Sequence, residues 1–189
     1  MKVEKLDRPG ACNISPARLD FVWLSDPYKV DEKDAGKYQV TILIPKTETE
    51  AVKTLRSIIA EVTDIGKVTK WKQTVPAELR EVLRDGDERR NDPNGVYKGC
   101  WYLTAKSARQ VPAFNRNKLP ITNPDELYSG MWGAVNLAVF PYKASGSCGL
   151  AAGLNAVMKL RDDERLGGGG PSADVFDNCD FGDVSDDDL

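Results

Sequence analysis

A carboxylate cluster in the middle of the chain is the first group of residues whose types could perform chemistry. Asp85, Asp87 and Glu88 could hold Mg²⁺ for hydrolysis of a phosphodiester or form part of a calcium loop. The calcium-loop spacing fails, because that loop needs oxygen ligands at alternating positions and a bidentate Glu at the twelfth. Arg89 and Arg90 follow directly, and their charges repel a cation. A metal-dependent nuclease that uses Asp85, Asp87 and Glu88 is therefore kept only as an alternative.

The absence of histidine narrows the remaining chemistry further. It removes histidine general bases, Ser–His and Cys–His nucleophile pairs, and most zinc sites. The four cysteines form no C-x-x-C pair, which disfavours a zinc knuckle or a redox motif, and scattered thiols fit a reducing cytosol. The sequence therefore predicts a protein that is not an enzyme and that needs no metal or cofactor.

Basic side chains gather in the middle third of the chain. Residues 65–118 hold twelve basic and six acidic side chains, whereas the whole chain has 26 basic and 29 acidic ones. Seven of the aspartates lie in residues 167–189, and without them 26 basic residues face 22 acidic ones, a net charge of +4. A basic body of this kind indicates a surface that binds a polyanion.

Aromatic residues are interleaved with these cations, a pattern that suits single-stranded nucleic acid. Cations follow the phosphates, and rings stack on splayed bases, at ~1–3 kcal/mol per base. The residues predicted to stack on bases are Trp71, Tyr102, Phe114 and Tyr142. The residues predicted to contact phosphates are Lys67, Lys70, Lys72, Lys98, Lys106, Arg109 and Arg116.

Residues 167–189 read as a Gly-rich linker and an acidic tail. Gly, Pro, Ser and Asp bury too little apolar surface to offset the entropy of ordering, so the tail is predicted to be disordered. We expect its aspartates to imitate phosphates and its phenylalanines to imitate bases, so that the tail competes for the DNA groove and docks on partner proteins. The tail residues assigned to these roles are Phe176, Phe181, Asp183, Asp186, Asp187, Asp188 and Leu189.

The elements that must position the basic groove read as about five strands and one helix. Alternating apolar residues predict strands over 17–24, 37–44, 97–106, 131–142 and 150–160, and Ala17, Leu19, Phe21 and Trp23 are expected to share one apolar face of the first. An apolar helical stripe runs from Leu55 to Val62, and residues 66–98 form a long polar insertion. The sequence therefore predicts a mainly β protein, a five-stranded OB barrel over residues 1–166, a fold whose groove binds oligonucleotides.

An ordered series of short motifs resembles a family of bacteriophage single-stranded DNA-binding proteins with an OB fold and an acidic tail. The motifs are Leu83–Asp87, Tyr97–Gly99, Thr104–Ser107, Leu127–Gly130, Gly153–Asp162 and Leu166–Gly168. The resemblance covers essentially the whole chain. It implies a role in phage replication, recombination or repair, single-strand binding without strong sequence preference, and replication or recombination proteins as partners of the tail.

Two further expectations concern the setting and an alternative ligand. The start of the chain has no signal-peptide core, and no apolar run approaches the about 18 residues of a membrane span, so we expect the cytoplasm of the host bacterium. An RNA-binding OB protein remains an alternative, although no clear means of sensing a 2′-hydroxyl is visible. A homo-oligomer is compatible with the sequence.

Overall fold

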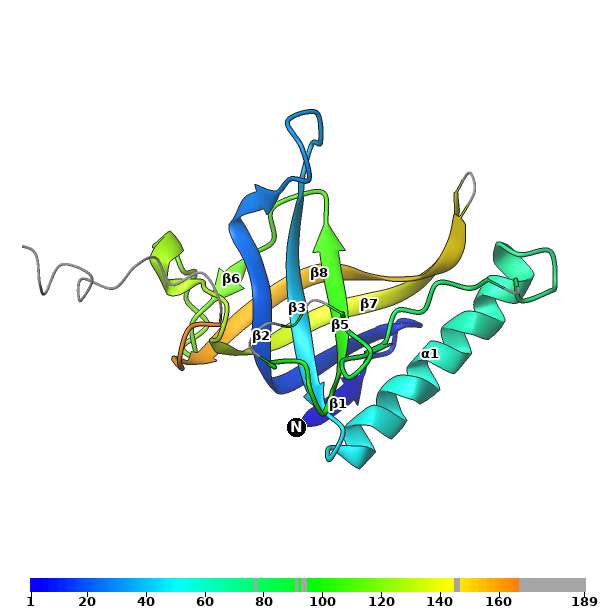
Figure 1. The fold of residues 1–189 in the computed structure, drawn as a ribbon, viewed down its shortest axis with the longest axis horizontal. Helices are drawn as coiled ribbons and strands as arrows, with labels where there is room; N and C mark the ends of the chain where they lie inside the picture. The colour runs from blue at the N-terminus through cyan, green and yellow to red at the C-terminus, as the bar shows by residue number, and fades with distance from the viewer. Residues whose placement is uncertain (77, 91, 93–94, 145–146, 167–189) are drawn as a thin grey trace, which may run out of the picture.

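The computed structural model describes residues 1–76, 78–90, 92, 95–144 and 147–166, and Figure 1 shows a strongly curved sheet with one long helix beside it. The elements in chain order are β1 (Lys2–Lys5), β2 (Ala11–Tyr28), β3 (Lys37–Pro45), α1 (Thr49–Thr69), β4 (Arg84–Asp85), β5 (Cys100–Ser107), β6 (Ala113–Phe114), the 3₁₀ turn η1 (Pro124–Glu126), β7 (Trp132–Ala144) and β8 (Ser147–Arg161). No helix in these described ranges is long and apolar enough to cross a membrane.

Five of the strands close into a barrel. Antiparallel pairing runs from β5 through β3, β2 and β7 to β8. A parallel contact then joins β8 to β5, with Ala105 opposite Ala152 and Lys106 opposite Gly153. Three short strands are added to the barrel strands: β1 pairs with β2, β4 with β5, and β6 with β8. The chain has the five-stranded OB barrel that the sequence predicts.

Strict alternation of side chains fills the barrel. Val40, Ile42 and Ile44 of β3 are fully buried, as are Leu103 and Ala105 of β5. Their neighbours on each strand point to the outer face, because successive residues of a strand face opposite sides. The outward neighbours on β3 are Gln39, Thr41 and Leu43, and these are largely covered as well.

Helix α1 lies along one side of the barrel (Figure 1) and packs against β1 and β7. Leu55, Ile58 and Val62 form its buried stripe, as the sequence predicts. Gly66 continues this stripe, and a Cβ there would lie 2.6 Å from a ring carbon of Trp71. The missing side chain lets the indole pack directly on the helix.

One predicted face of β2 is wrong. Ala17 and Leu19 point into the barrel and are fully buried, but Phe21 and Trp23 are each 40% exposed. The pairing with β3 shifts between Asp20 and Trp23, and Phe21 adopts φ +46°. This bulge ends the alternation on which the prediction rested, because it inserts an extra residue into β2.

Candidate nucleic-acid interface

A groove of about 660 Å³ runs over the outer surface where β4, β5, β7 and β8 meet. Strand β3 also contributes through Lys37, so five strands and the neighbouring loop residues line the groove, and four of the lining side chains are basic. The charged and aromatic residues that line it are Lys37, Arg80, Glu81, Arg84, Lys106, Phe140 and Tyr142. Four cations against one carboxylate, with two aromatic rings, match the needs of a single-stranded polyanion.

Backbone contacts to the strands place the two arginines at this groove. The Arg80 N–H donates to the Cys148 carbonyl at 3.1 Å, and its own carbonyl accepts from Leu150 N–H at 2.9 Å. Gly149 allows this approach, since a Cβ there would lie 2.6 Å from the Arg80 carbonyl oxygen. Arg84 lies on β4, opposite Tyr102 of β5. The polar insertion is thereby fixed to both β8 and β5.

Lys106 lies among other positive charges in the groove. Partial burial, and then the positive charges of Lys37 and Arg84, hold the pKa of Lys106 below its usual value, and only Asp34 opposes this effect. A cluster of like charges disfavours the protonated amine, whereas a bound anion would favour it. The groove is thus electrostatically arranged for phosphates rather than for an internal ion pair.

Phe140 supplies the exposed ring of the groove. It is 45% exposed on β7, and a Cβ on Gly153 of β8 would lie 3.4 Å from its ring. Because Gly153 has no side chain, the phenyl ring lies directly beside the backbone of β8. Tyr142 follows on the same face, with its hydroxyl 3.2 Å from the Ser147 hydroxyl. Both rings lie on the long β7–β8 hairpin, which extends beyond the barrel in Figure 1.

The structure corrects the prediction that Trp71 stacks on a base. Its indole is only 4% exposed and belongs to the main core. The indole N–H donates to the Tyr142 carbonyl at 3.1 Å, so the ring is held between α1 and β7. A lone tryptophan between lysines resembled a binding residue, but the chain turns back after α1 and buries it.

Tyr102 needs the same correction. It is 7% exposed and packs with Leu43 and Tyr97 in a small second cluster on the outer face of β3 and β5. The rings of Tyr97 and Tyr102 meet edge to face at 5.0 Å, and the Arg89 guanidinium lies 3.9 Å from the Tyr97 ring centroid. Tyr97 also donates to the buried Asp20 carboxylate. Residues of the insertion therefore cover Tyr102.

The predicted phosphate contacts fall into three places. Lys106 lines the groove, and Arg109 follows shortly after it, with its backbone N–H on the Ser107 hydroxyl. Lys70 and Lys72 flank Trp71, whose indole N–H donates to the carbonyl of Tyr142, a groove residue. Lys67, on α1, forms an ion pair with Asp64 at 2.6 Å. Lys98 lies elsewhere, close enough to Asp87 to lower the pKa of that carboxyl.

Phe114 and Arg116 lie outside the groove. Phe114 pairs with Met158, near the end of β8 remote from Gly149 and Gly153. Its ring borders a separate cavity of about 450 Å³. The structure therefore brings Lys106 and Tyr142 together and leaves Phe114 and Arg116 apart from them.

The carboxylates considered for a nuclease have a structural partner. Lys46 lies 2.6 Å from both Asp85 and Asp87, and Asp87 also accepts from the Gly99 N–H at 2.7 Å. The pKa of Asp85 is lowered first by Lys46, and that of Asp87 first by the Gly99 N–H and then by Lys46. These contacts give the pair a role in fixing the insertion to the turn between β3 and α1. The residues that the structure describes contain no group of three acidic, Cys or His side chains arranged for a metal.

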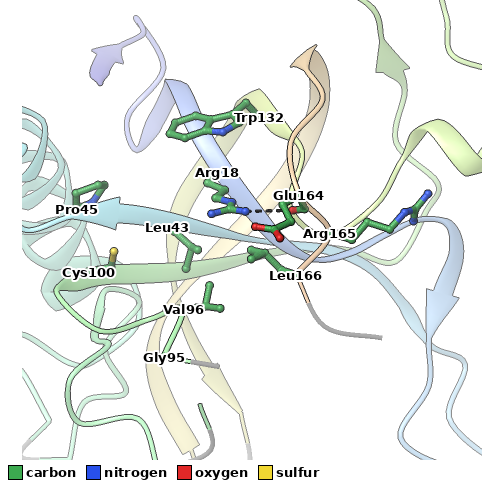
Figure 2. Close-up of a pocket in the computed structure, with 10 residues that line it drawn as sticks. All are labelled: Arg18, Leu43, Pro45, Gly95, Val96, Cys100, Trp132, Glu164, Arg165 and Leu166. Atoms are coloured by element: carbon green, nitrogen blue, oxygen red, sulfur yellow. Dashed lines mark hydrogen bonds between the residues drawn. The ribbon is translucent and has the colours of Figure 1, made fainter. Parts of the chain in front are cut away.

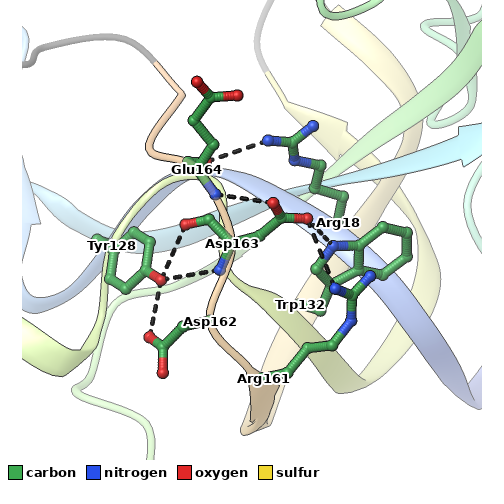
Figure 3. Close-up of polar contacts among 7 residues, drawn as sticks. All are labelled: Arg18, Tyr128, Trp132, Arg161, Asp162, Asp163 and Glu164. Atoms are coloured by element: carbon green, nitrogen blue, oxygen red, sulfur yellow. Dashed lines mark hydrogen bonds and ion pairs between the residues drawn. The ribbon is translucent and has the colours of Figure 1, made fainter.

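The last described residues, Asp162–Leu166, are anchored on the outer face of the barrel. Figure 3 shows Tyr128 donating to Asp162 and the Trp132 indole donating to Asp163, while Arg18 holds the Glu164 carbonyl at 3.1 Å. The indole is the main cause of the lowered pKa of Asp163. The negative charge of this anchor therefore persists at neutral pH.

Leu166 then packs beside Leu43 and Val96 at the edge of a cavity of about 590 Å³ (Figure 2). The chain thus leaves the barrel from the same outer face that carries the groove. The predicted roles of Phe176, Phe181, Asp183, Asp186, Asp187, Asp188 and Leu189 fall on residues outside those that the structure describes.

Sequence reasoning missed Lys37, Arg80, Arg84 and Phe140 as groove residues. Arg80 and Arg84 lie in the insertion and Lys37 at the start of β3, and only tertiary pairing brings the insertion and β3 together at the groove. Phe140 did carry a signal, because alternation in residues 131–142 places it opposite the buried Val139 and Leu137.

The fold matches solved structures of phage single-stranded DNA-binding proteins. One is the protein from bacteriophage Enc34 in complex with single-stranded DNA, with TM-score 0.70 and 24% identity over 84% of this chain and 90% of that one. Another is gp2.5 of bacteriophage T7, with TM-score 0.51 and 16% identity over 93% and 98% of the two chains. These likenesses show the fold.

Sequence comparison shows the family. A protein called putative protein p50, from Acyrthosiphon pisum secondary endosymbiont phage 1, is 30% identical over 174 residues, which cover 87% of this chain and 91% of that protein. The family model described as Enterobacter phage Enc34, ssDNA-binding protein, matches residues 12–189. The chain belongs to this family of phage single-stranded DNA-binding proteins.

Proposed function

We propose that this chain binds single-stranded DNA through the groove lined by Lys37, Arg80, Arg84, Lys106 and Phe140. The excess of positive charge around Lys106, with four cations in the groove against Glu81 and the nearby Asp34, is the observation that carries the proposal. The Enc34 relative was solved with single-stranded DNA, and its barrel has the same fold. Residues 1–166 are the DNA-binding domain in this proposal, and residues 167–189 are its tail.

The mechanism needs no catalysis and little sequence recognition. Cations contact phosphates, which every nucleotide carries, and Phe140 and Tyr142 stack on bases, each of which has a π-face. Such binding would protect single strands in the host cytoplasm during phage replication, recombination or repair. The tail would dock on other proteins of that machinery.

A titration of the full-length protein tests this function. Labelled single-stranded DNA, the matched duplex and the matched RNA are compared with magnesium present. We expect tight binding to single-stranded DNA, a log–log salt slope of about −0.7 per phosphate neutralised, and full-length strands after incubation. Salt-independent affinity would contradict the groove, shortened strands would support the nuclease, and preference for RNA would support the RNA-binding alternative.

Binding should depend on pH through Lys106. Phosphates favour its protonated form, so its pKa should be higher in the complex than in the free protein, where burial, Lys37 and Arg84 lower it. Affinity should therefore fall as the pH rises through the free-protein pKa, in the alkaline range below the ordinary lysine value of about 10.4. Lys106→Arg stays charged throughout this range, so its affinity should change less with pH. Equal pH slopes for the wild type and Lys106→Arg, measured by fluorescence anisotropy, would show that Lys106 does not contact the phosphates.

The position of Leu166 supports self-competition by the tail. Leu166 packs in the cluster of Leu43, and Gln39, opposite Lys106, is four residues away on β3, or about 13 Å of strand. The following 23 residues can cover that distance at about 3.3 Å per residue. A flexible tether gives an effective concentration on the order of millimolar, so weak tail binding would be enough to oppose DNA.

Truncation after Leu166 should tighten single-strand binding at low salt and change it little at high salt. Aspartates that imitate phosphates no longer compete, and the body that remains has a net charge of +4. Filter binding at several salt concentrations measures the effect. The full-length variant Phe176→Ala/Phe181→Ala separates the ring contribution from the charge. Unchanged or weaker binding after truncation would rule out self-competition.

A further inference from the structure

The bulge of β2 places two aromatic rings on the outer face of the barrel. Asp20 lies opposite Thr41 and Trp23 opposite Gln39, so three steps on β2 match two on β3. Phe21, within the bulge, has φ +46°, a region that a bulky side chain rarely enters. Regular alternation from Asp20 would have turned Phe21 and Trp23 inward. A strained backbone that exposes two aromatic side chains suggests a functional reason for the strain.

Strand pairing connects these rings to the groove through Gln39, which is itself buried. Trp23 lies opposite Gln39, and Gln39 lies opposite Lys106, so the three residues form one row across the outer face. The Trp23 ring is 5.4 Å from the Tyr28 ring, and Tyr28 pairs with Lys37, which also lines the groove. Tyr28, at the end of β2, therefore gives a second connection between Trp23 and the groove.

The surroundings of the rings favour a negatively charged ligand. The Arg89 guanidinium lies 5.5 Å from the Phe21 ring centroid, and Lys37 and Lys106 lie on the groove side. The neighbouring carboxylate of Asp20 is buried and already accepts from the Tyr97 hydroxyl and the Phe21 N–H, and Asp34 only partly offsets the charge of Lys106. An apolar protein partner would not need these cations, whereas phosphates between stacked bases would.

We propose that Phe21 and Trp23 form a second base-stacking platform for the same DNA strand that occupies the groove. The proposal rests on the proposed function. A strand that stacks on Phe140, beside Gly153 of β8, would cross β5 and β3 and reach the platform on β2. The path covers three strand spacings, or about 14 Å, which is about four nucleotides at the 3.4 Å spacing of stacked bases.

Oligothymidines of about 2 nucleotides, too short for this path, and of about 12 nucleotides, within the range of OB site sizes, test the platform. Trp23→Leu should weaken binding of the longer oligomer by roughly 5- to 100-fold, the range for one lost stack. The shorter oligomer cannot occupy both sites, so its affinity should stay within about twofold, since it can stack on Phe140 alone. Trp23→Phe, which keeps a π-face, should retain most of the affinity for the longer oligomer.

Phe21→Asn separates binding from folding. Asparagine accepts a positive φ more readily than phenylalanine, so this variant should melt at the same or a higher temperature while it binds the longer oligomer more weakly. If Trp23→Leu and Phe21→Asn leave the longer oligomer's affinity unchanged while Phe140→Ala weakens it, the platform is wrong and the groove stands. If the wild-type protein binds neither oligomer, the proposed function itself fails.

Discussion

Exchange of Arg84 and Lys106 together for glutamine weakens single-strand binding by at least about 100-fold at low salt, since each hydrogen bond to a charged group contributes about 1.5–3 kcal/mol. The log–log salt slope becomes shallower by about 1.4, because two fewer phosphates are neutralised. The fold is retained, since Lys37 and Arg84 already lower the pKa of Lys106 and removal of two cations relieves their repulsion. Anisotropy titrations across salt, with a melting curve for each protein, measure both effects.

Arg116→Gln/Lys118→Gln is the matched control for this variant. It removes the same charge from the loop after β6, which pairs with the remote end of β8. We expect only a small loss from weaker long-range attraction, with the salt slope almost unchanged. An equal loss in both double variants would mean that binding depends on total charge, and the groove would not be the site.

Trp71→Ala should lower the free energy of unfolding by about 3–5 kcal/mol, the usual range for loss of a buried tryptophan. The indole fills the space above Gly66 and donates to the Tyr142 carbonyl, so its removal leaves both a cavity and an unpaired acceptor. Denaturant unfolding followed by circular dichroism gives the value. A loss of this size is a large part of the stability of an ordinary domain.

Trp71→Phe provides the comparison. The phenyl ring keeps most of the packing and loses the indole hydrogen bond, so a smaller loss, on the order of 1–2 kcal/mol, is expected. A base-stacking residue would behave differently, since its alanine variant would fold normally and bind DNA weakly. That pattern in Trp71→Ala would restore the role that the sequence predicts for Trp71.

The barrel could be predicted from the sequence because its signals are local. Alternation in residues 37–44 and 131–142 marks β3 and β7, and the Leu55 to Val62 stripe marks α1. The bulge could not be predicted in this way. One extra residue before Trp23 reverses the faces of β2, and its cause is the pairing with β3 rather than any neighbouring residue.

The groove was only partly predictable for a related reason. Lys106 and Tyr142 carried a local pattern of cations and rings, but their partners did not. Arg80 reaches the groove because it pairs with Gly149 of β8, nearly seventy positions later in the chain. Trp71 and Tyr102 show the opposite error, since an aromatic residue in a polar stretch can still be buried by a distant element.

Ultraviolet cross-linking of the full-length protein to oligothymidine, followed by peptide mass spectrometry, tests the groove most directly. Cross-links form where a ring stacks on a base, and all aromatic residues of the protein are sampled together. Cross-links on Phe140 or Tyr142 of β7, lost when unlabelled single-stranded DNA is added in excess, are the predicted result. Cross-links confined to Phe114, with none on β7, would contradict the groove as the DNA-binding site.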